Sequence, residues 1–515
     1  MRARGCVRGS RREPVVRFGV ASVGLVAGGL VVGALGGCDS AGDTLPGRSR
    51  PIFEHGWADP SELALGPAAF TPPDPSGAFL ETSSGAQAYV VPGGAGDPLV
   101  RITAALPLGR LHEAEGEAGA SALLAQLLTT RGPAGASDPL SLRLAELGTS
   151  LSTVETLDAT HISLHVLPED WQEALELLVE VVRNPDLDAA AIRAYRAGPG
   201  YSMPMAGIGG DGFRPKVELE RRLGGYPLAP PDPGTMVAPA AVRGLAARSL
   251  AADRVVFGIG GAVSRGEVEE ALESATRGWA ASGGPAAGAN VVGPAADGSA
   301  TASVGASDRF HGVDVPSLEG WIAIGRAVGA VAESDRAALA VLRFILAERL
   351  NIAAREIRGL ANRDDFEIPV TGSGSGLLVV RTGGRPEAIA PLVRYSLDEI
   401  ERMHDPDEPV SEAEVARAKG WLVEAVWRRS LELATTSSAT LSVEHVRRGG
   451  TDHLMGWPGA VGVVTAEDVK AVAQEYLDPA VFVTVVAGPL ERIRAARHPR
   501  WPVALDDLEA ELSGR

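Results

Sequence analysis

The sequence predicts an α+β protein, in which helices pack in layers on mostly antiparallel sheet. Strand-like runs follow one another directly at several places, and amphipathic helical segments separate them. A stretch rich in Gly, Ala, Pro and Ser, residues 281–307, divides the chain into two halves and is interpreted as a linker. With 515 residues and 45% hydrophobic content, the chain is long enough for two or more packed domains.

The N-terminus has the order of a bacterial lipoprotein signal. Six arginines between Arg2 and Arg17 form a basic region, Phe18–Leu35 has no charge, and Leu35-Gly36-Gly37-Cys38 follows. The alternative is an uncleaved membrane helix, because about 18 apolar residues is near the lower limit for a span. Small residues directly before a cysteine favour cleavage, so we expect residues 1–37 to be a signal peptide and Cys38 to be lipidated.

This signal predicts an exported, lipid-anchored protein of the bacterial cell envelope. Residues 38–78 would then be a tether and N-terminal extension. Cys6 lies in the leader, so Cys38 would be the only cysteine of the mature chain, and no disulfide could form within it.

The first half of the chain has a consistent pattern of strands and helices. Two strands come first, then a helix at Gly116–Thr129, then a further helix, two more strands and a strongly amphipathic helix. The four predicted strands are Ala86–Val91, Leu99–Leu106, Thr149–Thr156 and Thr160–Leu167. In the amphipathic helix, six apolar residues from Trp171 to Val182 recur at three- and four-residue spacing, so one stripe faces a core.

The two halves of the chain are related in sequence. Val237–Ser264 aligns without gaps on Val464–Glu491, at a constant offset of 227 residues. The six identical pairs are Val237/Val464, Val242/Val469, Ala246/Ala473, Leu250/Leu477, Val256/Val483 and Gly261/Gly488. Generic similarity between helix-strand units can produce part of this agreement, so a duplication is one of two interpretations.

The charge of the chain argues against a nucleic-acid partner. The formal charge is −17, and because the first 37 residues contribute +5, the remainder has −22. Phosphate binding needs the opposite sign.

Three segments resemble the insulinase/pitrilysin family of metallopeptidases, the group that includes the mitochondrial processing peptidase. They are Leu144–Pro185, the segment AAREIRGLANRDD at Ala353–Asp365, and the run VTAEDVKAVAQEYLDPAVFVTVVAGP from Val464. The resemblance extends from about Phe79 to Arg492. It implies two homologous α+β domains, residues 79–280 and 308–492, clamped around an internal chamber and joined by the linker 281–307, with residues 493–515 as a C-terminal tail.

Active members of this family have an inverted zinc motif, His-x-x-Glu-His, on a helix of the first domain. The two histidines bind the metal, and the glutamate acts as general base on the zinc-bound water. The resemblance places these positions on Ala122, Ala125 and Gln126, within Gly119–Gly132. Alanine has no ligand atom, and an amide is a poor zinc ligand beside imidazole or carboxylate.

The third zinc ligand of the family is a glutamate on a helix roughly seventy to eighty residues later. Here that distance falls within Arg196–Met205, and no Glu occurs between Glu180 and Glu218. Gly198-Pro199-Gly200 would also break a helix. We therefore expect that the zinc site is lost and that the chain has no cofactor.

A second feature of the family is an Arg and a Tyr, seven residues apart in the second domain, which contact the substrate backbone. Arg355 occupies the Arg position and Asn362 the Tyr position. Asn can donate and accept a hydrogen bond, but it lacks the reach of a phenol. The resemblance implies substrate binding by this pair, and the alternative is that Arg355 forms an ion pair with an acidic neighbour on its helix.

The remaining polar motifs predict structure rather than chemistry. His161 and His165 lie on one predicted strand, about 13 Å apart, which is too far to share one ion. His112 and Glu113 precede the helix of the degenerate motif and are expected at the surface. Gly372–Gly376 is followed by an apolar strand, whereas phosphate loops open into a helix, so a turn is expected there.

The sequence therefore predicts a non-catalytic peptidase homologue, and whether the chain has activity by itself stays open. The first hypothesis is a subunit that pairs as a heteromer with a zinc-bearing insulinase-family paralogue, completes its peptide chamber and presents Arg355 to a peptide substrate. The second is a peptide- or protein-binding envelope lipoprotein without any proteolytic role. The third is residual peptidase activity of the single chain.

Overall fold

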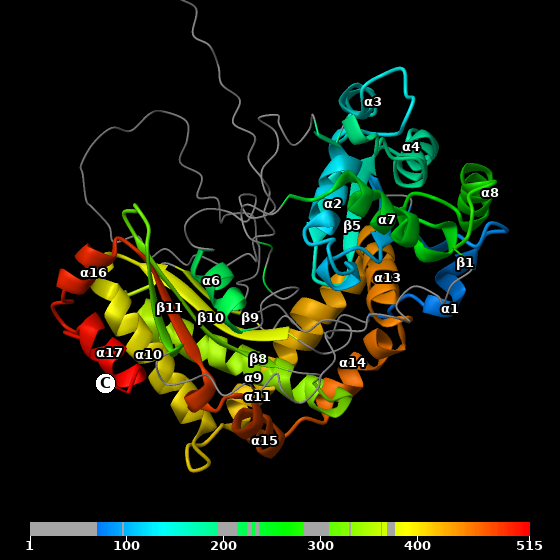
Figure 1. The fold of residues 1–515 in the computed structure, drawn as a ribbon. Coiled ribbons are helices and arrows are strands. Elements are labelled where there is room, and N and C mark those ends of the chain that lie inside the picture. Colours follow the sequence, from blue (N-terminus) through cyan, green and yellow to red (C-terminus); the bar gives the residue numbers. More distant parts are fainter. Residues whose placement is uncertain are drawn as a thin grey trace, which may run out of the picture. The chain divides into compact units, whose positions relative to one another are not determined.

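The structure is a computed structural model that describes residues 70–94, 97–190, 192–193, 214–223, 229, 231, 236–282, 308–328, 331–361, 363–367 and 376–514 (Figure 1). All of these belong to one compact unit, Ala69–Arg515. The predicted signal peptide, Cys38 and most of the linker 281–307 lie outside them. Within the described residues, no helix is long and apolar enough to cross a membrane.

Two sheets organise the fold. The first sheet has the strand order β1-β2-β6-β3-β5-β4, and the second has the order β7-β11-β8-β10-β9. Each sheet is antiparallel except for one parallel pair, β2 with β6 and β7 with β11. The strands of the first sheet are β1 (Phe79–Glu81), β2 (Gln87–Pro92), β3 (Val100–Leu106), β4 (Ser152–Glu155), β5 (Thr160–Val166) and β6 (Val256–Gly261). Those of the second sheet are β7 (Phe310–Asp314), β8 (Gly320–Val328), β9 (Arg363–Glu367), β10 (Gly376–Gly384) and β11 (Val483–Gly488).

The internal duplication is confirmed by the folded chain. Shifting α7 (Pro239–Ser249) and β6 by 227 residues gives the bounds of α15 (Ala466–Tyr476) and β11. The strand order β2-β6-β3-β5-β4 of the first sheet also repeats as β7-β11-β8-β10-β9 in the second. The equivalent glycines Gly261 and Gly488 end their strands at φ of 127° and 150°, a conformation that other residues rarely adopt.

Helices bury one stripe against each sheet, as the sequence pattern predicts. In α4 (Trp171–Arg183) every residue of the predicted apolar stripe is buried. The other helices of the first core are α2 (Ala120–Thr130), α3 (Leu140–Glu146), α7 and α8 (Arg265–Thr276). The second core is built from α9 (Arg336–Leu350), α10 (Pro386–His404), α11 (Glu412–Gly420), α15, α16 (Leu490–Ala495) and α17 (Leu505–Leu512). The fold is thus α+β, with two homologous layers of helices on sheet.

Each half of the chain also contributes one helix to the sheet of the other half. Helix α13 (Ala434–Arg448) lies against β6, β3 and β2 of the first sheet, and α6 (Arg214–Leu223) lies against β8 and β11 of the second. Close approach of α13 requires glycine in β6. A Cβ on Gly260 would lie 2.1 Å from the carbonyl oxygen of Ala434, and one on Gly258 would lie 2.3 Å from that of Ser438.

Two π-helical turns interrupt the second half. η7 (Asn351–Ile357) continues α9, and η8 (Trp421–Arg428) continues α11 and leads into α12 (Arg429–Glu432). Helix α14 (Asp452–Gly462) follows α13 and contacts both η8 and α9. The short elements are α1 (Pro75–Ala78), η2 (Arg110–His112), η4 (Ala252–Arg254), η6 (Glu333–Asp335) and η9 (Pro479–Val481). The π-helical turns, such as η7 and η8, occur often at functional sites.

Several predicted boundaries differ from the structure for a local reason. The helix expected from Gly116 begins at Ala120, because Gly116 and Gly119 both have positive φ and cannot continue a helix backwards. Within the predicted tail, α17 packs on α10 and α16 through three buried leucines. The domain boundaries themselves stay a prediction.

Candidate functional site

Helix α2 contains the three positions at which the resemblance places the zinc motif. Ala122 and Ala125 have 8% and 0% of their surface exposed, and Gln126 is half-buried. The helix packs against α7 and β4, and Ala125 belongs to the first hydrophobic core. A methyl group can neither bind a metal nor move a proton, so these two alanines contribute packing alone.

The loop before α2 supplies the cap that the helix lacks. Gly119, the N-cap residue, has no side chain, and the carboxylate of Glu113 accepts hydrogen bonds from the amides of Gly119 (2.8 Å) and Ser121 (2.7 Å) and from the Ser121 hydroxyl. A carboxylate at a helix N-terminus also interacts favourably with the helix dipole. Glu113 therefore fixes the start of α2.

His112 and Glu113 are half-buried, so their predicted placement at the surface is wrong. The His112 ring donates from Nε2 to the carbonyl oxygen of Asp158 at 2.7 Å. Burial lowers the pKa of His112 and raises the pKa of Glu113, although hydrogen bonds from Ser121 oppose the second effect. Both side chains hold the loop before α2 in place.

A charged group that the sequence did not reveal surrounds this loop. Arg110 interacts with Glu220, Glu113 and Glu155, which come from α6, the loop and β4. Burial lowers the pKa of Arg110, and the three carboxylates oppose that shift. Burial also raises the pKa of Glu155 to about 7, against the attraction of Arg110. The four residues are up to 110 positions apart, so only the fold brings them together.

The group of glutamates does not amount to a metal site. Among the described residues, no three His, Cys, Asp or Glu side chains are arranged to hold an ion. The segment Arg196–Met205, where the family resemblance places the third zinc ligand, lies outside the described residues. The loss of the zinc site therefore stays a prediction.

His161 and His165 lie on β5, as predicted, opposite Ala105 and Arg101 of β3. Burial, followed by the charges of Arg101 and Arg447, lowers the pKa of His161 to about 4. Burial and Arg101 also lower the pKa of His165. Both rings are therefore neutral at physiological pH.

Arg355 lies on the π-helical turn η7 and is exposed to solvent over 54% of its side chain. Its Nε lies 3.7 Å from a carboxylate oxygen of Glu356, which is 63% exposed, so the pair is weak. The acidic neighbour considered in the sequence is thus present, and the exposed guanidinium also remains accessible to a ligand. Asn362, the other half of the predicted pair, lies outside the described residues.

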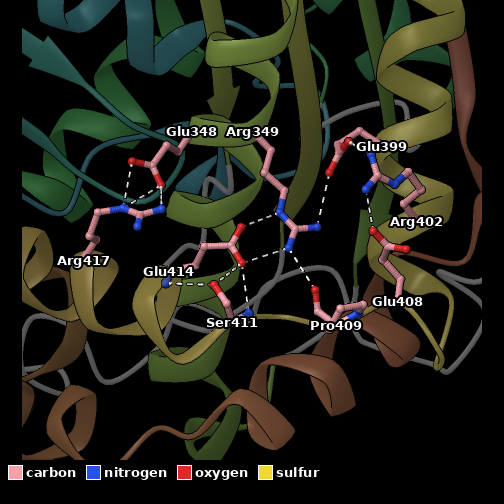
Figure 2. Close-up of polar contacts among 9 residues, drawn as sticks. All are labelled: Glu348, Arg349, Glu399, Arg402, Glu408, Pro409, Ser411, Glu414 and Arg417. Atoms are coloured by element: carbon pink, nitrogen blue, oxygen red, sulfur yellow. Dashed lines mark hydrogen bonds and ion pairs between the residues drawn. The ribbon is translucent and has the colours of Figure 1, made fainter.

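A network of ion pairs fixes the base of η7 (Figure 2). Arg349, at the end of α9, donates from Nε to Glu414 of α11 at 2.7 Å and from Nη1 to Glu399 of α10 at 3.4 Å. Its Nη2 donates to the second carboxylate oxygen of Glu414 at 3.0 Å and to the carbonyl oxygen of Pro409 at 3.1 Å. Because η7 begins two residues after Arg349, this network positions the turn that contains Arg355.

The outer members of the network extend it along the three helices. Arg402 donates to the buried carboxylate of Glu399 at 3.3 Å and also pairs with Glu408, and Arg417 pairs with Glu348 at 2.9 Å (Figure 2). Burial would raise the pKa of Glu414, but the hydrogen bonds from Arg349 and Ser411 outweigh it and lower this pKa to about 2. Charge-assisted bonds of this kind are stronger than neutral ones.

Residues 96–202 match the family model described as Insulinase (Peptidase family M16). The matched segment begins before β3 and extends past α4, so it includes α2 and the loop of Glu113. Over these residues the chain is similar to the insulinase family. No curated protein matches its sequence significantly.

Two solved structures share the fold of this chain. One is a peptidase M16 inactive domain from Pseudomonas fluorescens, 22% identical, with a TM-score of 0.63 over 82% of this chain and 98% of that one. The other is a protease from Helicobacter pylori, 15% identical, with a TM-score of 0.61 over 79% of this chain and 98% of that one. At these identities the likeness establishes the fold, and α+β with two homologous domains is confirmed.

Proposed function

We propose that this insulinase-family homologue is a non-catalytic subunit that binds a zinc-bearing paralogue and completes its peptide chamber. The observation that supports it most is the state of α2, where buried Ala122 and Ala125 stand in place of a ligand and the general base. Loss of these groups removes both metal binding and proton transfer. Both sheets are nevertheless present in the described residues, so the fold does not depend on these groups.

A relative described as an inactive domain is consistent with this proposal. That description belongs to the Pseudomonas fluorescens protein, and the fold of this chain matches 98% of it. On this proposal the chain contains no zinc.

Arg355 is the group through which such a subunit would contact peptide. Its side chain is exposed, and the bond of Arg349 to Glu414 holds the start of the turn η7, on which Arg355 lies. A guanidinium donates hydrogen bonds to peptide carbonyl oxygens without losing its charge. We include Asn362 in this proposal as the second contact implied by the family.

The proposal also includes the location of the complex. Cys38 would be lipidated after removal of residues 1–37, which would hold the subunit at a membrane of the bacterial envelope. A lipid anchor and the tether 38–78 would then keep both subunits where exported peptides are encountered.

Co-purification tests the heteromer. The protein, tagged at its C-terminus in its source bacterium, is expected to co-purify with one insulinase-family protein that has an intact His-x-x-Glu-His motif, and to raise its kcat/KM for peptides. Isolation alone at every concentration, with no change in the paralogue's activity, would refute the subunit role. If peptides bind the chain in the absence of any paralogue, the envelope binding-protein hypothesis is favoured instead.

The role of Arg355 is tested in the same complex. Arg355→Gln is expected to raise KM for peptide about tenfold, since one charge-assisted hydrogen bond is lost. Glu356→Gln is the matched control, because it removes the same ion pair but leaves the guanidinium. Equal effects of the two substitutions would mean that Arg355 serves only its ion pair.

A further inference from the structure

A pocket of about 300 Å³ opens between η8, α13, α14 and the start of α9. Its apolar wall contains Val426, Trp427, Leu454 and Trp457. The Trp427 indole donates its N–H to the carbonyl oxygen of Leu454 at 2.7 Å, which fixes that ring. A cavity of this volume with aromatic walls and a few polar groups is the size of a small-molecule site.

The polar wall contains two arginines that both pair with the exposed carboxylate of Glu333. Arg336 and Arg448 line the pocket with 15% and 19% of their side chains exposed. Glu333 lies 2.8 Å from Arg336 Nε and 2.6 Å from Arg448 Nη2, and its own side chain is 65% exposed. A ligand carboxylate could replace Glu333 at low cost, because an exposed partner returns to water.

The one acidic group of the lining is already neutralised. Glu444 accepts a hydrogen bond from His453 Nε2 at 2.9 Å and another from Arg447 Nη1 at 3.0 Å. Arg447 also pairs with buried Asp158 of the first half, so it is fixed on both sides. Glu444 is therefore a poor partner for a ligand cation, and the arginines favour an anion.

We propose that this pocket binds a small organic carboxylate with an apolar or aromatic body, such as a hydrophobic amino acid or the C-terminal residue of a peptide. Its carboxylate would pair with Arg448 and Arg336, and its body would lie against Trp427 and Trp457. The site lies on residues other than α2 and Arg355, so it does not depend on the proposed subunit role.

Calorimetric titration of the purified protein with matched probes tests the chemistry. N-acetyl-L-phenylalanine is expected to bind, and its neutral amide to bind about tenfold more weakly, because the charge-assisted bonds are lost. Acetate, which lacks the apolar body, is expected not to bind measurably. Equal binding of the acid and the amide would overturn the proposal.

Two further probes distinguish the sources of the carboxylate. Tighter binding of free phenylalanine than of the acetylated form points to an amino acid. Tighter binding of a pentapeptide that ends in phenylalanine points to a peptide C-terminus.

Variants of the polar wall test the site itself. Arg448→Gln is expected to weaken binding of N-acetyl-L-phenylalanine about tenfold. Glu333→Gln is expected to tighten it several-fold, because the competing carboxylate is removed, and a gain of affinity cannot come from misfolding. Arg417→Gln, in the ion pair with Glu348 outside the pocket, is the control and should leave affinity unchanged. Unchanged affinity in both Arg448→Gln and Glu333→Gln would refute the site.

Discussion

At the scale of single residues, two neighbouring positions of α2 have different surroundings. Ala125, on which the family resemblance places the general base, is fully buried in an apolar core, whereas Gln126, next to it, is half-buried. The two positions therefore respond differently to the same charge. An ionised carboxylate in the core has no counter-charge and must either perturb the fold or take up a proton.

The first prediction compares Ala125→Glu with Gln126→Glu. We expect Ala125→Glu to lower the free energy of unfolding by about 3 kcal/mol or more, because it buries an unpaired carboxyl group. Gln126→Glu, which keeps the volume at a half-buried position, should cost less than about 1 kcal/mol. Urea unfolding followed by circular dichroism measures both, and equal stabilities would mean that α2 faces water at Ala125.

The second prediction concerns His161, which is kept neutral by burial and by two arginines. Its pKa is about 4 in the fold and near the ordinary 6.5 when unfolded, so the unfolded chain binds more protons between these values. The contribution of neutral His161 to stability is complete above pH 6.5 and is lost as the pH falls towards 4. The melting temperature of the variant His161→Gln should therefore fall less between pH 7.5 and pH 5 than that of the original protein. A parallel fall in both would exclude His161 as the titrating group.

At the scale of elements, the ion pairs of Arg349 show how charged side chains connect the end of α9 to α10 and α11. Glu399 has 4% of its side chain exposed and receives bonds from Arg349 and Arg402, while Glu414 both caps α11 and binds Arg349. These bonds join α9, α10 and α11 directly before α9 becomes η7 and α11 becomes η8. The irregular turns are thus supported from regular helices.

The third prediction removes the centre of this network. Arg349→Met is expected to cost about 3 kcal/mol of unfolding free energy, because Glu399 is left buried with less compensation. Arg417→Met removes an exposed pair of the same helices and should leave the free energy of unfolding nearly unchanged. Denaturant unfolding of the two variants measures the difference. A loss of the same size in both would show that Glu399 is reached by water.

Sequence alone predicted most of the elements and missed those that depend on distant partners. The amphipathic stripe of α4 follows from local periodicity, and the 227-residue repeat follows from the gapless alignment of the two halves. The π-helical turns η7 and η8 have no periodic signature, since they continue ordinary helices. The charged group around Arg110 also required the fold, because its partners come from separate elements. Glu113 caps α2 from six residues before Gly119, which is outside the usual spacing of a capping box.

At the scale of the whole molecule, the two halves are joined by exchanged helices. Helix α13 of the second half lies on the first sheet, and its Arg447 pairs with buried Asp158 at 3.3 Å. Tyr89 of β2 lies 2.9 Å from Nδ1 of His445 of the same helix. The absence of side chains at Gly258 and Gly260 of β6 permits this approach. The union of the halves therefore depends on backbone contact as well as on polar pairs.

The last prediction tests that contact with one methyl group. Gly260→Ala would place a Cβ 2.1 Å from the carbonyl oxygen of Ala434, so α13 must move away from β6. We expect a loss of about 1–3 kcal/mol, together with faster hydrogen exchange in α13. Gly266→Ala is the matched control, because nothing lies within 4 Å of its Cβ in α8, and the same change should stabilise that helix by up to about 1 kcal/mol. Opposite signs for one chemical change would locate the effect at the packing of α13 on β6, and a stabilising Gly260→Ala would show that the helix does not depend on this close approach.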